Sequence, residues 1–240
     1  AKTPDDLKAQ FPWIEDLLTT LGIPVVRCDG FEADDVIATI ARQCQKEGRH
    51  CCVLSGDKDL MQLANDTTHI LKPDKAQVWA ELDADGIAAE WGVRPEKLLD
   101  LLSLMGDTAD NVPGVKGIGP KSAIKLLDEY GSLEGIYENA DAIKGAQGEK
   151  IRADKENAFL SKKLITLRDD VPCVHNPDDF ATSTLHFKET ATALIGFELP
   201  AVAKLYMTLA TESGEDIASS SSRGAVRLVQ RSEEHTSELQ

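Results

Sequence analysis

Short apolar runs that alternate with helical patterns constrain the fold of this chain more than any other feature of its sequence. The runs at 23–28, 50–55 and 68–73 have the length and composition of strands. The segments at 32–48 and 57–64 lie between them and begin with acidic residues, as helices commonly do. Strands that alternate with helices form βαβ units, so we predict an α/β core built on a parallel sheet that is buried on both faces.

The rest of the chain has mostly helical patterns. A helix is expected at 4–21, before the first apolar run, and strands stop at about residue 83. Beyond that point we expect helices at 83–92, 95–106, 119–131 and 132–140, a long helix near 147–168, and two more across 187–209. This organisation predicts an all-α domain that follows the α/β core.

The two ends of the chain have unusual sequences. Position 1 is not Met, and no strand precedes the first expected helix, so we expect a fragment of a longer protein. Residues 210–230 are rich in serine and have the composition of a flexible linker. The last ten residues, RSEEHTSELQ at 231–240, match a translated sequencing adapter and are left out of the fold prediction.

Composition limits the function classes. The chain has 26 basic and 41 acidic residues and a net charge of −15, which argues against binding nucleic acid by overall charge. It has neither an apolar stretch long enough to span a bilayer nor a signal-peptide pattern at its start, so we expect no membrane contact. Its five cysteines are odd in number and form no Cys-x-x-Cys pair, as in a reducing compartment. We therefore expect a cytoplasmic protein.

Acidic residues gather in three short segments, FEADD (31–35), SGDKD (55–59) and GDTAD (106–110). Acids at a helix start can simply complement the helix dipole, a contribution of roughly 0.3–1 kcal/mol each. However, the strand-to-helix junctions of a parallel sheet share one edge, so the first two segments would bring five carboxylates together. Such mutual repulsion calls for a cation, and oxygen ligands without His or Cys favour Mg²⁺ or Mn²⁺.

A glycine-rich hairpin, GVKGIGPKSA at 114–123, follows the third acidic segment. Gly117 and Gly119 flank Ile118, and Pro120 can begin a helix whose free N–H groups would face an anion such as phosphate. The alternative is an ordinary turn with Ile118 packed inward. The hairpin lacks the Gly-Lys-Ser/Thr ending of a P-loop, which excludes that nucleotide-binding motif. Residues 116–168 have ten basic and eight acidic side chains, a local balance that permits DNA contact.

Three longer motifs, GFEADDVIAT, SGDKDLMQL and LMGDTADNVPGVKGIGPKSA, occur in this order in the chain. Together they closely resemble the flap endonuclease family, to which the 5′ nuclease domain of bacterial DNA polymerase I belongs. The resemblance runs from Thr3 to Thr208. It implies a partial PIN-like nuclease core at 1–103 and a helix-three-turn-helix DNA-binding domain, related to the helix-hairpin-helix, at 104–209.

The resemblance also implies roles for individual residues. It implies two Mg²⁺ or Mn²⁺ ions held by Glu32, Asp34, Asp35, Asp57, Asp59, Asp107 and Asp110. It implies DNA contacts at the hairpin from Lys116, Gly117, Ile118, Gly119, Lys121 and Ser122. A monovalent cation such as K⁺ is a further expectation at the hairpin. No side chain other than the metal ligands is expected to be catalytic.

The activity implied is 5′-3′ exonuclease and flap endonuclease hydrolysis of DNA at flaps, nicks or 5′ ends, in replication and repair. A polymerase domain would follow the linker in the same chain, and a monomer is expected. Family members have two further aspartates and a helical arch upstream of the region present here, so we expect this fragment alone to cut poorly. Two alternatives stay open: a non-catalytic DNA-binding module, and a 5′ nuclease without a polymerase.

Overall fold

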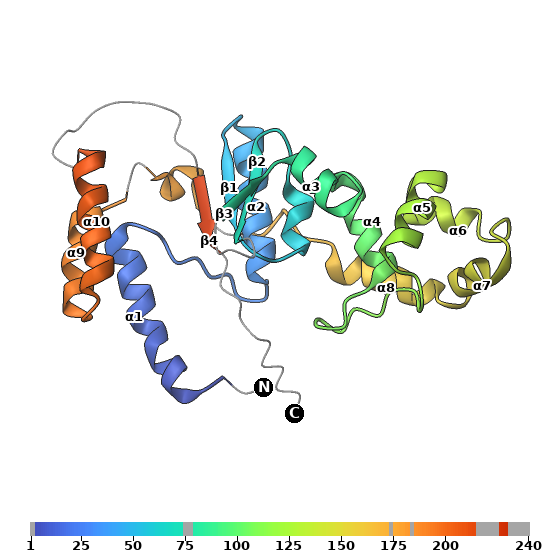
Figure 1. Ribbon diagram of the computed structural model, residues 1–240, viewed down its shortest axis with the longest axis horizontal. Coiled ribbons are helices and arrows are strands. Elements are labelled where there is room, and N and C mark those ends of the chain that lie inside the picture. Colours follow the sequence, from blue (N-terminus) through green and yellow to red (C-terminus); the bar gives the residue numbers. More distant parts are fainter. Residues whose placement is uncertain (1–2, 74–78, 173–174, 183–184, 215–225, 230–240) are drawn as a thin grey trace. The chain divides into compact units, whose positions relative to one another are not determined.

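The computed structural model describes residues 3–73, 79–172, 175–182, 185–214 and 226–229 (Figure 1). The chain divides into two compact units: unit 1 consists of residues 1–52 and 170–240, and unit 2 of residues 53–169. The domain limits that we predict from sequence, 1–103 and 104–209, are a different division and stay a prediction.

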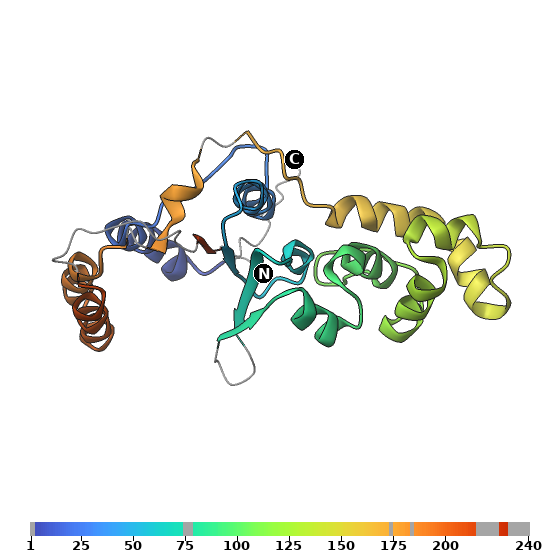
Figure 2. The same ribbon diagram turned by 90° about the horizontal axis from the view of Figure 1, so that it is seen from above.

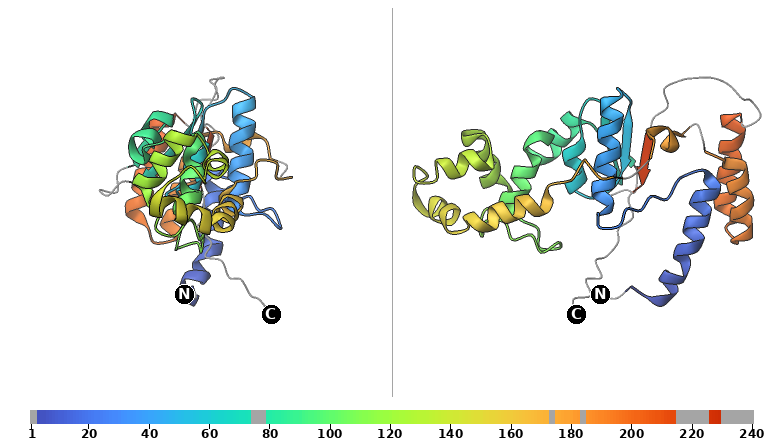
Figure 3. Two further views of the ribbon diagram at one scale, coloured as in Figure 1. Left: turned by 90° about the vertical axis from the view of Figure 1, so that its right-hand side faces the viewer. Right: turned by 180° about the vertical axis from the view of Figure 1, so that it is seen from behind.

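Unit 1 is mostly helical. Its described elements are α1 (Asp5–Leu21), α2 (Ala33–Lys46), the 3₁₀ helix η2 (Pro177–Phe180), α9 (Phe187–Gly196), α10 (Pro200–Ser213) and β4 (Val226–Val229). α1 packs against α9, and α9 and α10 lie side by side as an antiparallel pair (Figure 3). α2 buries its apolar face, including Ile37, Ile40 and Cys44, as its helical spacing predicts. No helix among the described residues is long and apolar enough to cross a membrane.

β1, β2 and β3 are neighbours in one sheet, in the order β3-β2-β1. β1 (Cys51–Leu54) and β2 (Thr68–Pro73) occur where their apolar runs predict strands, and the 3₁₀ helix η1 (Asp59–Leu63) lies between them in sequence. β2 pairs in antiparallel fashion with β3 (Trp79–Leu82), with Ile70 opposite Leu82 (Figure 2). This pair is an antiparallel part of a sheet that we predicted to be parallel throughout.

One strand prediction is wrong, and one strand was missed. Residues 23–28 are not a strand: the segment follows α1 without regular structure, and none of the described strands pairs with it. An apolar run becomes a strand only where a neighbouring strand supplies ladder hydrogen bonds, and Val25 is instead 37% exposed. β3 was not predicted, because its residues alternate between exposed and half-buried and contain no apolar run.

Unit 2 surrounds the buried helix α4 (Pro95–Met105), which contacts at least four other helices and η1. Leu98, Leu101 and Leu104 on α4 are fully buried. The remaining helices are α3 (Ala84–Trp91), α5 (Pro120–Tyr130), α6 (Leu133–Glu138), α7 (Gly145–Ala153) and α8 (Lys155–Ile165).

The single long helix expected near 147–168 is two helices, α7 and α8, which meet at Asp154. The Asp154 carboxylate accepts hydrogen bonds from the Lys116 N–H at 2.9 Å and from the Asn157 side chain at 3.1 Å. The backbone of Asp154 (φ −107°, ψ 26°) departs from helical values at this break, which the apolar periodicity did not reveal.

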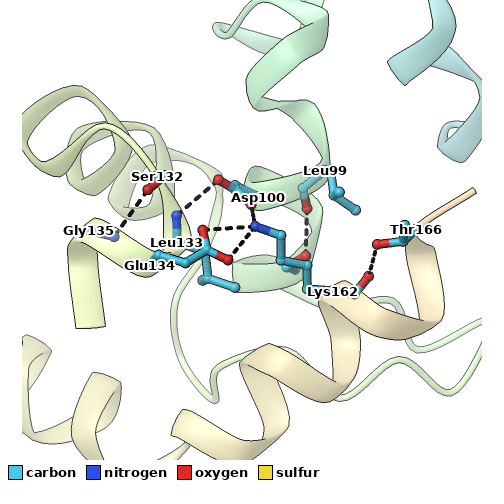
Figure 4. Close-up of polar contacts among 9 residues, drawn as sticks. Leu99, Asp100, Ser132, Leu133, Glu134, Gly135, Lys162 and Thr166 are labelled. Carbon is cyan, nitrogen blue, oxygen red and sulfur yellow. Dashed lines mark hydrogen bonds and ion pairs between the residues drawn. The ribbon is translucent and has the colours of Figure 1, made fainter. Parts of the chain in front are cut away.

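An ion-pair network joins α4, α6 and α8 in unit 2 (Figure 4), with Asp100 buried and Glu134 at the surface. Lys162 Nζ lies 2.8 Å from Asp100 Oδ1 and 2.7 Å from Glu134 Oε1. The other oxygen of Asp100 accepts the Leu133 N–H at 3.0 Å. Asp100 is only 8% exposed, so water has little access to it, and each of its two oxygens has a partner within the protein.

The network makes stability depend on pH at both extremes. The hydrogen bond from Lys162 holds the pKa of Glu134 below its usual 4.5. Because the folded pKa is depressed, this stabilisation is present above pH 4.5 and is lost as pH falls through the lower folded value. Burial opposes the Lys162 charge, but the bonds to Asp100 and Glu134 outweigh it and raise the Lys162 pKa above 10.5. That contribution is present below pH 10.5 and is lost as pH rises through the folded value.

We expect the free energy of unfolding to fall below pH 4.5, and to fall less steeply in Glu134→Gln, which cannot titrate there. Chemical denaturation between acidic and neutral pH measures both slopes. Glu138→Gln on the same helix is the control and should keep the wild-type slope. Equal slopes in wild type and Glu134→Gln would contradict the assignment.

The segment predicted to be a linker, 210–230, begins inside α10, which extends to Ser213, and contains β4. Residues 215–225 of that segment and the adapter-like residues 231–240 lie outside the described residues.

Candidate functional site

The first acidic segment lies at the start of α2, in unit 1. Glu32 precedes the helix with extended backbone (φ −82°, ψ 159°), and its side chain makes no capping hydrogen bond. Asp34 and Asp35 lie in the first turn and are half-buried. Side-chain capping, the alternative explanation for an acid at this position, therefore does not account for Glu32.

The second acidic segment is a tight turn that follows β1. The buried Ser55 hydroxyl accepts the Asp57 N–H at 3.0 Å, and Asp57 Oδ1 accepts the Asp59 N–H at 2.9 Å. Such side-chain-to-backbone bonds fix an Asx turn, which here leads into η1. The turn holds Asp57, Lys58 and Asp59 in a defined backbone conformation.

The third acidic segment belongs to a closed loop between α4 and the hairpin. The N–H and C=O of Asp107 pair with those of Val112 at 2.8 and 2.7 Å, and Asp107 Oδ1 accepts the Ala109 N–H at 2.8 Å. The backbones of Gly106 and Gly114 lie against each other and close the loop. Both glycines have positive φ, +70° and +59°. The loop therefore presents Asp107 and Asp110 from a rigid base.

Lys58 joins the second and third acidic segments. Its ammonium pairs with Asp107 Oδ2 and lies 3.6 Å from Asp110 Oδ2. The side chains of Asp107 and Lys58 are 14% and 26% exposed, while Asp110 is 63% exposed. The sequence did not distinguish this lysine from a solvated one, because its partners are distant along the chain.

The structure thus places Asp107 and Asp110 together around Lys58, whose sequence neighbours Asp57 and Asp59 are two more of the seven residues proposed as metal ligands. Among the described residues, no three acidic, histidine or cysteine side chains converge closely enough to hold a metal ion. Glu32, Asp34 and Asp35 belong to unit 1. The grouping of all seven carboxylates in one pocket stays a prediction.

The glycine hairpin combines an inward and an outward side. Val115 and Ile118 are buried, at 2% and 6% exposure, whereas Lys116, Gly117, Gly119 and Lys121 are exposed. Gly117 has φ +78°, which favours glycine, and Gly119 precedes α5 as its N-cap without a side chain. Ile118 packs inward, as the alternative interpretation of the hairpin predicts. The backbone of the neighbouring Gly117 and Gly119 is exposed to solvent.

Contacts distant in sequence hold the hairpin. Lys150 Nζ donates to the Gly117 carbonyl at 3.1 Å, from 33 positions away, and Asp154 accepts the Lys116 N–H from 38 positions away. Ser161 Oγ accepts the Gly114 N–H at 2.9 Å, from 47 positions away. Sequence reasoning missed these residues, since no local pattern marks a hydrogen bond to a distant backbone group.

Two family descriptions match the chain. Residues 1–92 match the family described as "5′-3′ exonuclease, N-terminal resolvase-like domain", and residues 93–188 match "5′-3′ exonuclease, C-terminal SAM fold". DNA polymerase I of Treponema pallidum is 46% identical over 211 residues, 88% of this chain and 21% of that protein. The thermostable DNA polymerase I of Thermus aquaticus is 41% identical over 177 residues, 72% of this chain and 20% of that protein.

Solved structures of a phage T5 5′-exonuclease have a similar fold. The T5 enzyme described with bound divalent zinc has a TM-score of 0.57 and 25% identity, covering 80% of this chain and 72% of that one. A mutant of the same enzyme has a TM-score of 0.58 and 24% identity, covering 78% of this chain and 75% of that one. The chain itself spans about one fifth of the length of the curated relatives above.

Proposed function

The chain belongs to the 5′-3′ exonuclease family, and we propose that it is the 5′ nuclease part of a DNA polymerase I, which hydrolyses phosphodiesters at flaps, nicks or 5′ ends of DNA. One observation carries the proposal. In the part of the chain that matches the family, a rigid turn with Asp57 and Asp59 meets a closed loop with Asp107 and Asp110, and a single lysine bridges them.

The donors fit hard divalent ions. Both turns offer carboxylate oxygens, and neither 55–59 nor 106–112 contains His or Cys. Asp57 and Asp107 would be the more fixed ligands, because hydrogen bonds already orient their side chains. Two Mg²⁺ or Mn²⁺ ions bound there would supply an activated water and charge stabilisation at the leaving oxygen. The T5 neighbour described with zinc supports a divalent ion in this fold.

The hairpin would hold the DNA backbone. Lys116 and Lys121 are exposed beside the solvent-facing backbone of Gly117 and Gly119, and α5 begins immediately after. Backbone N–H groups and a few lysines bind phosphates without regard to sequence. This arrangement fits an acidic protein, since it needs no overall positive charge. The Gly117 carbonyl, already bonded to Lys150, is also where a K⁺ ion would compete.

Cleavage of a 5′-flap DNA by the complete gene product tests the nuclease assignment. With Mg²⁺, the double variant Asp57→Asn, Asp107→Asn should cut about 100-fold more slowly than wild type, because two metal ligands are lost. Asp128→Asn, an exposed acid on α5, is the matched control and should cut normally. Normal cutting by the double variant would refute the metal-site assignment and favour a module that only binds DNA.

Binding of flap DNA in Ca²⁺ or EDTA tests the hairpin separately. The double variant Lys116→Ala, Lys121→Ala should weaken binding equally for all sequences and reduce the slope of log K against log salt by about 2, one for each phosphate contact. Lys163→Ala, which replaces an exposed lysine on α8, is the control and should change this slope less than the double variant does. An unchanged slope in the double variant would remove the hairpin from the DNA interface.

The relatives support a polymerase context for this nuclease. Because they are DNA polymerases, we propose that a polymerase domain accompanies this nuclease in the same polypeptide, acting as a monomer on chromosomal DNA in the cytoplasm.

A further inference from the structure

Lys58 links the two acidic turns of unit 2. It lies between Asp57 and Asp59 in sequence, and its ammonium reaches across to Asp107 and Asp110 in the closed loop. Its side chain is 26% exposed, which is low for a lysine and reflects its contacts with the carboxylates.

The two oxygens of Asp107 have different partners. Oδ1 accepts the Ala109 N–H, a bond that shapes the loop, whereas Oδ2 is paired with Lys58. A divalent ion on that oxygen would lie next to the ammonium, and the two cations would repel each other strongly. Binding of an ion through Asp107 Oδ2 therefore requires Lys58 to leave.

The structure also indicates which partner moves. The backbone at 57–59 is fixed by the Asx turn, and Asp107 is fixed by its bridge to Val112 and its bond to Ala109. The flexible part is the four-carbon stem of Lys58, which can swing its ammonium toward solvent without disturbing either turn.

We propose that Lys58 is a built-in counterion of the metal site: it neutralises Asp107 and Asp110, and a divalent ion must displace it in order to bind. This inference rests on the proposed function, because it assumes that these carboxylates are metal ligands. Lys58 is thus a positioning residue that sets the affinity of the site. It stabilises the form without ion and, by linkage, weakens ion binding by the same factor.

Calorimetric titration of the chain with Mn²⁺ tests this role directly. Lys58→Met, which keeps the length of the stem but not its charge, should bind Mn²⁺ about fivefold more tightly than wild type, the equivalent of one partly exposed ion pair. Lys58→Arg keeps the charge and should bind like wild type. Lys163→Met, which removes one charge from an exposed site on α8, controls for the change in net charge.

A second measurement uses the unaltered protein. Lysine acetylation mapped by mass spectrometry should modify Lys58 slowly without ion and faster at saturating Mn²⁺, because the displaced ammonium becomes accessible. Lys163 should react at the same rate in both conditions. This measurement decides the question if Lys58→Met does not fold.

The outcomes separate this inference from the function on which it rests. Equal Mn²⁺ affinity in wild type and Lys58→Met, weaker binding by Lys58→Met, or a Lys58 acetylation rate that ignores Mn²⁺ would overturn the counterion role and leave the nuclease proposal intact. If neither wild type nor Lys58→Met binds Mn²⁺, the counterion role falls, whereas the nuclease proposal is decided by the cleavage test with the complete gene product.

Discussion

Replacing Lys162 with alanine is expected to lower the free energy of unfolding by about 3 kcal/mol, the cost of leaving a buried carboxylate without its partner. Asp100 is 8% exposed and has two partners, Lys162 and the Leu133 N–H. A single hydrogen bond from the Leu133 N–H does not compensate the full negative charge of the buried Asp100 carboxylate. Urea denaturation monitored by circular dichroism measures the change.

Two further variants isolate the cause. Lys163→Ala removes the neighbouring exposed lysine and should change stability by no more than about 0.5 kcal/mol. The double variant Asp100→Asn, Lys162→Met should recover part of the loss, since an asparagine oxygen can still accept the Leu133 N–H and no buried charge remains. A loss in Lys162→Ala no larger than that in Lys163→Ala would show that the network contributes nothing.

Replacing Gly114 with alanine is expected to cost about 4 kcal/mol, combining a strained backbone with a clash against backbone atoms. Gly114 has φ +59°, and a Cβ there would lie 2.4 Å from the Gly106 nitrogen and 2.6 Å from the Met105 carbonyl carbon. Neither atom belongs to a side chain that could move aside. The loop would have to open, and Asp107 would lose the base that positions it.

Gly119→Ala is the matched control from the same segment. Gly119 has φ −103°, and a Cβ would meet no atom within 4 Å, so this variant should unfold like wild type. Thermal unfolding compares the two variants, and Mn²⁺ titration reports whether the acidic loop survives. A Gly114→Ala protein as stable as Gly119→Ala would refute the closed-loop description.

Local patterns predicted much of the secondary structure. β2 begins and ends at the residues of its apolar run, 68–73, and α2 buries the face that its spacing predicts. Predictions failed where contacts distant in sequence are involved. Residues 23–28 have no pairing strand among those described, and β3 is the partner of β2. Asp154, at the break between α7 and α8, bonds to the Lys116 N–H.

The same division applies to the site. The sequence by itself determined that three acidic segments lie next to helix starts or tight turns and that a glycine hairpin follows them, because turn chemistry and helix signals depend on neighbours in the chain. Only the tertiary structure decided which charges meet: Lys58 with Asp107 and Asp110, and Lys162 with Asp100 and Glu134. A lysine has the same local preferences whether its ammonium ends in water or on a carboxylate, so its partner is fixed by packing between distant segments.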